Sequence, residues 1–129
     1  MERQAKILVI DDDPDMVEML TMSLEAASYK VISAYNGVQG LQQARVEQPD
    51  AIILDIMMPE KDGFKVCKEL KSSEETADIP ILILTAVGDR FAATHYAVSM
   101  GLELDSEDYL DKPVDRDELL RRVGALVGR

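Results

Sequence analysis

The chain has 129 residues, of which 47% are apolar and 30% charged, and its formal net charge is −11. This composition is typical of one globular domain and excludes a fibrous or disordered chain. The charge disfavours direct contact with nucleic acid or with an anionic membrane. The first ten residues hold too short an apolar run for a signal peptide or a membrane span, and the single cysteine, Cys67, fits a reducing compartment. We predict one cytoplasmic domain over residues 1–129, with no output domain in this chain.

Short apolar runs alternate with longer helical patterns along the chain. All the predicted strands except the second and the weak fifth are almost continuously apolar, which is typical of strands buried on both faces of a parallel sheet. The predicted strands are Lys6–Ile10, Lys30–Ala34, Ala51–Leu54, Pro80–Leu84 and Asp108–Asp111. The predicted helices are Pro14–Ser28, Val38–Gln48, Asp62–Ser72, Asp89–Met100 and Asp115–Val127. Five strand–helix units in series predict an α/β fold with a doubly wound parallel sheet.

Polar residues stand where the predicted strands end. Asp11, Asp12 and Asp13 follow the first strand, Asp55 the third, Thr85 the fourth, and Lys112 the fifth. Because parallel strands share one carboxyl edge, these side chains should converge on a single polar site.

Clustered carboxylates need a positive partner, and oxygen ligands of this kind suit Mg²⁺. A carboxylate beside such an ion can act as a nucleophile and form an aspartyl-phosphate. Each residue also has a structural reading: Asp13 before Pro14 is best read as a helix N-cap, and Thr85 could cap the next helix. The four residue types together favour a phosphoryl site.

The chain resembles the receiver domain of two-component response regulators. The segments that carry the resemblance are "KILVIDDDPD" (6–15), "AIILDIMMPEKDGFKVCKELK" (51–71), "PILILTA" (80–86) and "DYLDKPVDRDELLRRV" (108–123). The resemblance implies a flavodoxin-like (βα)5 sandwich with strand order 2-1-3-4-5 and five flanking helices. It also implies that a histidine kinase or a histidine phosphotransfer protein donates a phosphoryl group to one aspartate.

The resemblance assigns the phosphoryl site residue by residue. Asp55 corresponds to the phospho-acceptor, and Asp11 and Asp12 to the acidic pair that holds Mg²⁺ with it. Met57 would add its backbone carbonyl to the metal. Lys112 corresponds to the lysine that contacts the phosphoryl group, and the Lys112–Pro113 peptide bond is expected to be cis.

The resemblance also implies a switch and two protein surfaces. Thr85 would turn towards the phosphoryl group and Tyr109 would swing in behind it, changing the surface of the fourth helix, the fifth strand and the fifth helix, where a downstream protein would bind. The kinase or phosphotransfer protein would dock on the first helix and on the loop after Lys112. The wide apolar arc of that helix predicts that some of Val17, Met19 and Met22 are exposed.

Three features depart from the usual pattern of this family. Residues 101–109, "GLELDSEDY", form a longer and more acidic segment than is usual before the aromatic. Val114 stands where phenylalanine is common. Met57 and Val87 put apolar side chains beside the site, and we hypothesise that they shield the phosphoryl group from water.

Two other interpretations stay open from the sequence. The first is an aspartyl-phosphate phosphohydrolase of the haloacid-dehalogenase type, whose first motif Asp11-x-Asp13 superficially resembles. In that interpretation Asp11 would be the nucleophile and Asp55 incidental. The other is a pseudo-receiver that uses the fold only as an adaptor. The complete set of acids, threonine and lysine favours a signalling phospho-acceptor, which is not an enzyme in the usual sense.

Overall fold

The computed structural model of the chain describes residues 4–56, 62–86 and 108–128. The predicted fourth helix, Asp89–Met100, lies outside these residues, as do Met57, Val87 and residues 101–107. The described elements are β1 (Lys6–Ile10), α1 (Pro14–Ala26), β2 (Lys30–Ala34), α2 (Gly37–Glu47), β3 (Ala51–Asp55), α3 (Asp62–Ser72), β4 (Ile81–Ala86), β5 (Asp108–Lys112) and α5 (Arg116–Val127).

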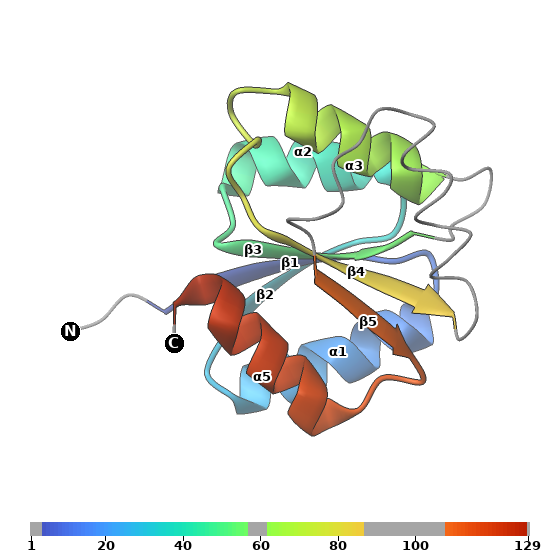
Figure 1. Ribbon diagram of the computed structural model, residues 1–129, viewed down its shortest axis with the longest axis vertical. Coiled ribbons are helices and arrows are strands. Elements are labelled where there is room, and N and C mark those ends of the chain that lie inside the picture. Colours follow the sequence, from blue (N-terminus) through green and yellow to red (C-terminus); the bar gives the residue numbers. More distant parts are fainter. Residues whose placement is uncertain (1–3, 57–61, 87–107, 129) are drawn as a thin grey trace.

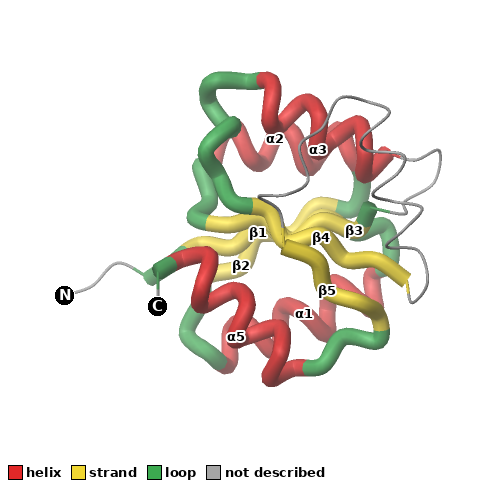
Figure 2. Tube along the Cα trace, in the orientation of Figure 1, coloured by secondary structure: helices red, strands yellow, loops and turns green. Residues whose placement is uncertain are grey.

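Five parallel strands form one sheet in the order β2-β1-β3-β4-β5. Helices α2 and α3 cover one face of this sheet, and α1 and α5 cover the other (Figure 1). The tube in Figure 2 shows the same three layers, with the sheet between two pairs of helices. The predicted flavodoxin-like strand order is confirmed, with four of the five flanking helices inside the described residues.

The sheet buries apolar side chains on both of its faces. One core cluster joins alternate residues of the strands to α2 and α3, and the other joins the remaining residues to α1 and α5. This is why the strands read as continuous apolar runs in the sequence. The fully buried residues of β1 and β3 are Ile7, Leu8, Val9, Ile10, Ala51, Ile52, Ile53 and Leu54.

Short polar side chains begin three of the described helices. Asp13 accepts a hydrogen bond from the Asp15 amide at 3.0 Å and caps α1, with Pro14 in the first turn, as predicted. Asn36 caps α2 through the Gln39 amide, and Asp115 caps α5 through the Glu118 amide. Each cap fixes where a helix leaves the carboxyl edge of the sheet.

Three strands extend further than their apolar runs predict. The predicted third strand ends at Leu54, whereas β3 continues to Asp55. The predicted fourth and fifth strands end at Leu84 and Asp111, whereas the ladder continues to pair Thr85 with Asp111 and Ala86 with Lys112. Backbone hydrogen bonding carries these strands past the point where their side chains become polar. The strand ends that carry the polar residues are therefore part of the rigid sheet.

Helix α1 is shorter than predicted and ends at Ala26, because Ser28 has a positive φ of 72°. A non-glycine residue in this region cannot continue a right-handed helix. Among the described helices, none is both long and apolar enough to cross a membrane.

The start of α3 lies directly against the end of β3. A Cβ atom added at Gly63 would lie 2.5 Å from the carbonyl oxygen of Asp55 and 2.5 Å from the Cα of Ile56. Both atoms belong to the backbone, so only glycine permits this approach. Gly63 therefore lets α3 pack against the strand end that carries Asp55.

Candidate functional site

The carboxyl ends of β1 and β3 bring three carboxylates together. Asp11 directly follows β1, and its amide donates to the Ala34 carbonyl of β2 at 3.1 Å. Asp55 is the last residue of β3. One carboxylate oxygen from each of Asp11, Asp12 and Asp55 lies within 4.8 Å of the other two. The predicted convergence of these acids is thus observed.

Lys112, the last residue of β5, supplies the positive charge of this cluster. Its Nζ donates to Asp55 Oδ2 at 3.2 Å and lies 3.9 Å from Asp11 Oδ2. The Lys112–Pro113 peptide bond is cis, as the resemblance implies. The ammonium therefore lies between the ends of β1 and β3, although β4 separates β3 from β5 in the sheet.

The three acids differ in burial. Asp11 is fully buried and Asp55 is 4% exposed, whereas Asp12 is exposed. Burial, with the nearby charge of Asp55, raises the pKa of Asp11 to about 7, against the lowering effects of the Asp13 amide and Lys112. One lysine therefore does not fully compensate the negative charge of the cluster.

This charge imbalance fits a divalent cation. Asp11 Oδ2 is buried and has no hydrogen-bond partner among the described residues. A buried carboxylate oxygen without a donor is unusual and calls for an explanation such as an ion. Carboxylates in a half-open cluster, with room for water and phosphate oxygens, are the ligands that Mg²⁺ prefers. The residues present therefore fit Mg²⁺.

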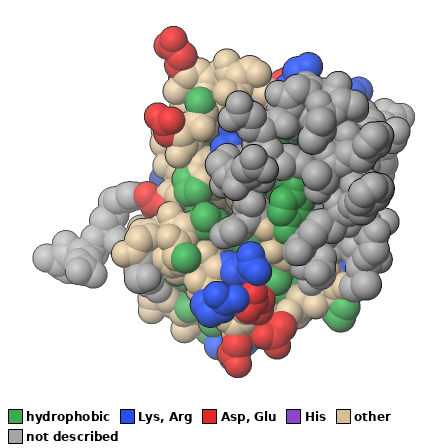
Figure 3. Space-filling model, in the orientation of Figure 1, with side chains coloured by type: hydrophobic (Ala, Val, Ile, Leu, Met, Phe, Trp, Pro, Cys, Tyr) green, Lys and Arg blue, Asp and Glu red, His purple; other side chains and the backbone are tan. Residues whose placement is uncertain are grey.

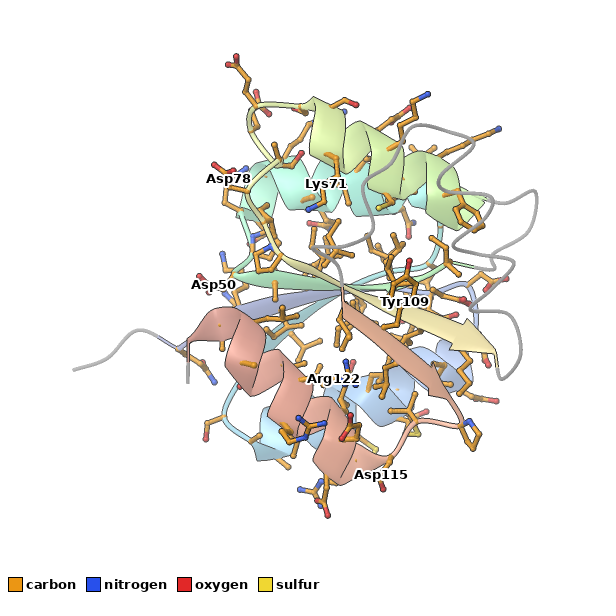
Figure 4. All side chains as sticks on the ribbon, in the orientation of Figure 1. Asp50, Lys71, Asp78, Tyr109, Asp115 and Arg122 are labelled. Carbon is orange, nitrogen blue, oxygen red and sulfur yellow. The ribbon has the colours of Figure 1, made fainter. Side chains whose placement is uncertain are left out.

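The remaining predicted site residues are described only in part. The backbone of Thr85 pairs with Asp111 near the end of β4, but the side chains of both residues lie outside the description, as does all of Met57. Tyr109 is half-buried in β5 and packs against the core cluster of α2 and α3. In Figure 4 its side chain extends from the sheet towards this helical layer.

Two features of the site were missed by reasoning from the sequence. The first is Gly63, which lies at the start of the predicted helix Asp62–Ser72 and permits the close approach of α3 to Asp55. The second is the Asp13 main-chain amide, which donates to Asp11 Oδ1 at 3.0 Å. A glycine eight residues after a site aspartate was a usable signal for the first, whereas no pattern of residue types marks a main-chain donor.

Helix α1 presents two methionines to solvent. Met22 is 65% and Met19 38% exposed, whereas Val17 is buried. Met22 also lines a shallow groove with Thr21 of the same helix and Tyr35 after β2. The prediction that part of this set is exposed is confirmed for the methionines.

Comparison with known proteins identifies the family. The family model of the response regulator receiver domain matches residues 7–124 of this chain. The chain is 44% identical over 127 residues to the DNA-binding dual master transcriptional regulator RpaA of Synechocystis, covering 96% of this chain and 49% of RpaA. It also resembles a crystal structure from Chloroflexus aurantiacus described as a response regulator, with 37% identity, a TM-score of 0.85, and coverage of 98% of this chain and 100% of the other.

A third similar protein bears on the metal. The receiver domain of the sensor histidine kinase PA1611 from Pseudomonas aeruginosa is 28% identical, with a TM-score of 0.84 and coverage of 98% of this chain and 100% of that one. Its crystal structure has a magnesium ion coordinated in the active-site cleft.

This chain belongs to the family of response regulator receiver domains of two-component systems. It spans about half the length of the curated relatives that it matches.

Family membership and site geometry together disfavour the phosphohydrolase interpretation. That reading makes Asp11 the nucleophile, but Asp11 is fully buried and its Oδ1 accepts a hydrogen bond from the Asp13 amide. Asp13, which the phosphohydrolase motif would place in the site, instead caps α1 with an exposed side chain.

Proposed function

We propose that this chain accepts a phosphoryl group on Asp55 in a Mg²⁺-dependent reaction and signals through protein contacts. The observation that carries the proposal is the Asp55 carboxylate at the end of β3, held 3.2 Å from Lys112 and close to the carboxylates of Asp11 and Asp12. A nucleophilic carboxylate, a fixed cation and a site for a second cation are the parts that phosphoryl transfer to an aspartate needs.

In this reaction an oxygen of Asp55 attacks the phosphorus of a phosphohistidine. A phosphorus–oxygen bond forms, and the phosphorus–nitrogen bond breaks with its electron pair going to the imidazole. Mg²⁺, held by Asp11, Asp12, Asp55 and the predicted carbonyl of Met57, would neutralise charge on the phosphoryl oxygens. Lys112 orients Asp55 before transfer and binds a phosphoryl oxygen afterwards.

The acceptor is a signalling residue rather than the site of a turnover reaction. The phosphoryl group gives Asp55 about two negative charges and new acceptor oxygens. Thr85, near the end of β4, would donate to these oxygens, and Tyr109 would move inward behind it. Tyr109 already packs against the core cluster of α2 and α3, so its movement would couple the site to neighbouring packing.

Two surfaces are proposed for partners. The exposed methionines of α1 and the loop after Lys112 would bind the histidine kinase or phosphotransfer protein. The fourth helix, β5 and α5 would bind a downstream protein. Figure 3 displays acidic and basic side chains side by side over α5, where Glu118 pairs with Arg121 and Arg122 at 2.6 and 2.7 Å.

The proposal includes no direct contact of this chain with nucleic acid or membrane, because its net charge of −11 would repel phosphate groups. The name of RpaA includes DNA binding, but this chain covers only 49% of the length of RpaA. A cytoplasmic location is part of the same proposal, and a chain whose single cysteine, Cys67, is buried is compatible with it.

Intact-mass spectrometry with acetyl phosphate as donor tests this function. We expect one added phosphoryl group on the wild-type chain in the presence of Mg²⁺, and none after chelation or in Asp55→Asn. An unmodified wild-type chain under conditions where another receiver domain is modified would contradict the proposal and favour the adaptor interpretation.

A further inference from the structure

The main chain of Asp13 contacts the proposed metal site, whereas its exposed side chain caps α1. The Asp13 amide donates to Asp11 Oδ1 at 3.0 Å. With Oδ1 engaged, the other oxygen of Asp11 is the one 3.9 Å from Lys112, buried and without a hydrogen-bond partner among the described residues. The amide thus selects which oxygen of Asp11 is offered to the site.

The direction of this amide is fixed by the first turn of α1. The Asp13 side chain accepts from the Asp15 amide at 3.0 Å, and the Asp13 carbonyl accepts from the Val17 amide at 3.1 Å. Pro14 follows and restricts Asp13 to the extended conformation observed, with φ −92° and ψ 109°. Two hydrogen bonds in the first turn of α1 and the following proline therefore fix the backbone of Asp13.

Asp11 needs such a constraint. It lies close to the like charge of Asp55 in a fully buried position, so repulsion would favour turning its carboxylate away. We propose that Asp13 is a positioning residue for the metal site: by capping α1 it holds its own amide against Asp11 Oδ1 and so presents Asp11 Oδ2 to the cation. This inference rests on the proposed Mg²⁺-dependent function.

Positioning groups behind a metal ligand typically contribute tenfold to a hundredfold in metal affinity. Two substitutions at this position separate the cap from the charge. Asp13→Ala removes the cap and one negative charge, whereas Asp13→Asn removes the charge but keeps an oxygen that can accept from the Asp15 amide. Any difference between the two variants therefore measures the cap.

Asp115→Ala is the matched control. Asp115 caps α5 through the Glu118 amide at 3.0 Å, so its replacement removes the same kind of cap and the same charge from another helix (Figure 4). A general loss of stability after decapping would appear in both alanine variants. An effect on the metal site should appear only at Asp13.

The experiment combines Mg²⁺ titration calorimetry with hydrogen exchange of the amide at position 13 in the metal-free chain. We expect Asp13→Ala to bind Mg²⁺ about tenfold more weakly than the wild type. Asp13→Asn should recover most of this loss, and Asp115→Ala should not differ from the wild type. The amide at position 13 should exchange about tenfold faster in Asp13→Ala than in the other three proteins.

The two readouts distinguish the inference from the function on which it rests. A wild-type chain that binds no Mg²⁺ would contradict the proposed function, whereas the exchange of the amide would still test the positioning. Equal exchange rates in the wild type and Asp13→Ala would overturn the inference. So would an equal loss of Mg²⁺ affinity in Asp13→Ala and Asp115→Ala.

Discussion

The ammonium of Lys112 donates a hydrogen bond to the carboxylate of Asp55 across 3.2 Å, joining the ends of two strands that are not neighbours in the sheet. The same ammonium lies 3.9 Å from Asp11. One ammonium is thus shared between two buried carboxylates and compensates them only in part. This shared contact predicts how the stability of the chain changes when Lys112 is replaced and when Mg²⁺ is added.

Lys112→Met should destabilise the metal-free chain by about 3 kcal/mol, because breaking a buried ion pair leaves an uncompensated charge. Added Mg²⁺ should restore much of this loss by neutralising the same carboxylates. Urea unfolding with and without Mg²⁺ measures both values. Lys6→Met is the control. Lys6 is similarly part-buried, and its Nζ lies 3.2 Å from the Glu47 carboxylate, in an ion pair outside the carboxylate cluster. A loss in Lys112→Met that Mg²⁺ leaves unchanged would contradict the proposed compensation.

The metal-free chain should become less stable as the pH rises from about 4 to 7. Its Asp11 pKa of about 7 lies above the ordinary value of 3.8, so the folded state keeps a proton that the unfolded state has lost. The contribution of Asp11 to the free energy of unfolding is therefore fully present below its unfolded pKa of 3.8. It is lost as the pH rises through its folded pKa of about 7. Asp11→Asn should remove this slope and stabilise the metal-free chain at pH 7 by at least about 1 kcal/mol.

Unfolding of wild type and Asp11→Asn across this pH range, without metal, provides the comparison. Identical slopes for the two proteins would mean that Asp11 does not carry the burial cost that its position implies.

Gly63→Ala should both destabilise the fold and disturb the site. The new Cβ would lie 2.5 Å from the Asp55 carbonyl oxygen, and backbone at that distance must shift. We expect a loss of about 1 to 3 kcal/mol and weaker Mg²⁺ binding. Gly40→Ala is the comparison, because its Cβ would meet the Ile10 side chain at 2.6 Å rather than backbone of the site. If both variants bind Mg²⁺ equally well, the role given to Gly63 is wrong.

Met22→Lys should slow phosphotransfer from a histidine kinase that phosphorylates the wild type, by roughly tenfold. Met22 is 65% exposed on the surface of α1 assigned to the kinase, and a hot-spot residue in a protein interface contributes about 1.4 kcal/mol or more. Phosphorylation by acetyl phosphate, which needs no docking, should be unchanged. Val38→Lys, at a 78% exposed position on α2, should leave both reactions unchanged. Slowing of both reactions in Met22→Lys would indicate damage to the site instead of lost docking.

Most strands were predictable because burial on both faces leaves a strong apolar signal, whereas their order in the sheet came from the family resemblance. Their ends were less predictable. Asp55 ends β3, Lys112 ends β5 and Thr85 is the last but one residue of β4, so apolarity alone stops each predicted strand one or two residues early. Likewise the end of α1 at Ala26 depends on a positive φ at Ser28, a residue type that gives no such signal.

The site was predictable as a set of residue types at one sheet edge, and the acids and Lys112 are found there. Main-chain geometry was not predictable. The donation from the Asp13 amide to Asp11 and the approach of Gly63 to Asp55 depend on how helices meet strands in space. Residue types constrain such contacts only weakly, because main-chain groups are common to all residues.

The identity of the phosphorylated residue tests the central claim most directly. Borohydride converts an acyl phosphate on aspartate to homoserine, so reduction after treatment with acetyl phosphate and Mg²⁺ followed by peptide mapping marks the acceptor. We predict homoserine at position 55 alone, in the peptide that contains the end of β3. Homoserine at position 11 would instead make Asp11 the nucleophile and contradict the account of this chain as a receiver that is phosphorylated on Asp55.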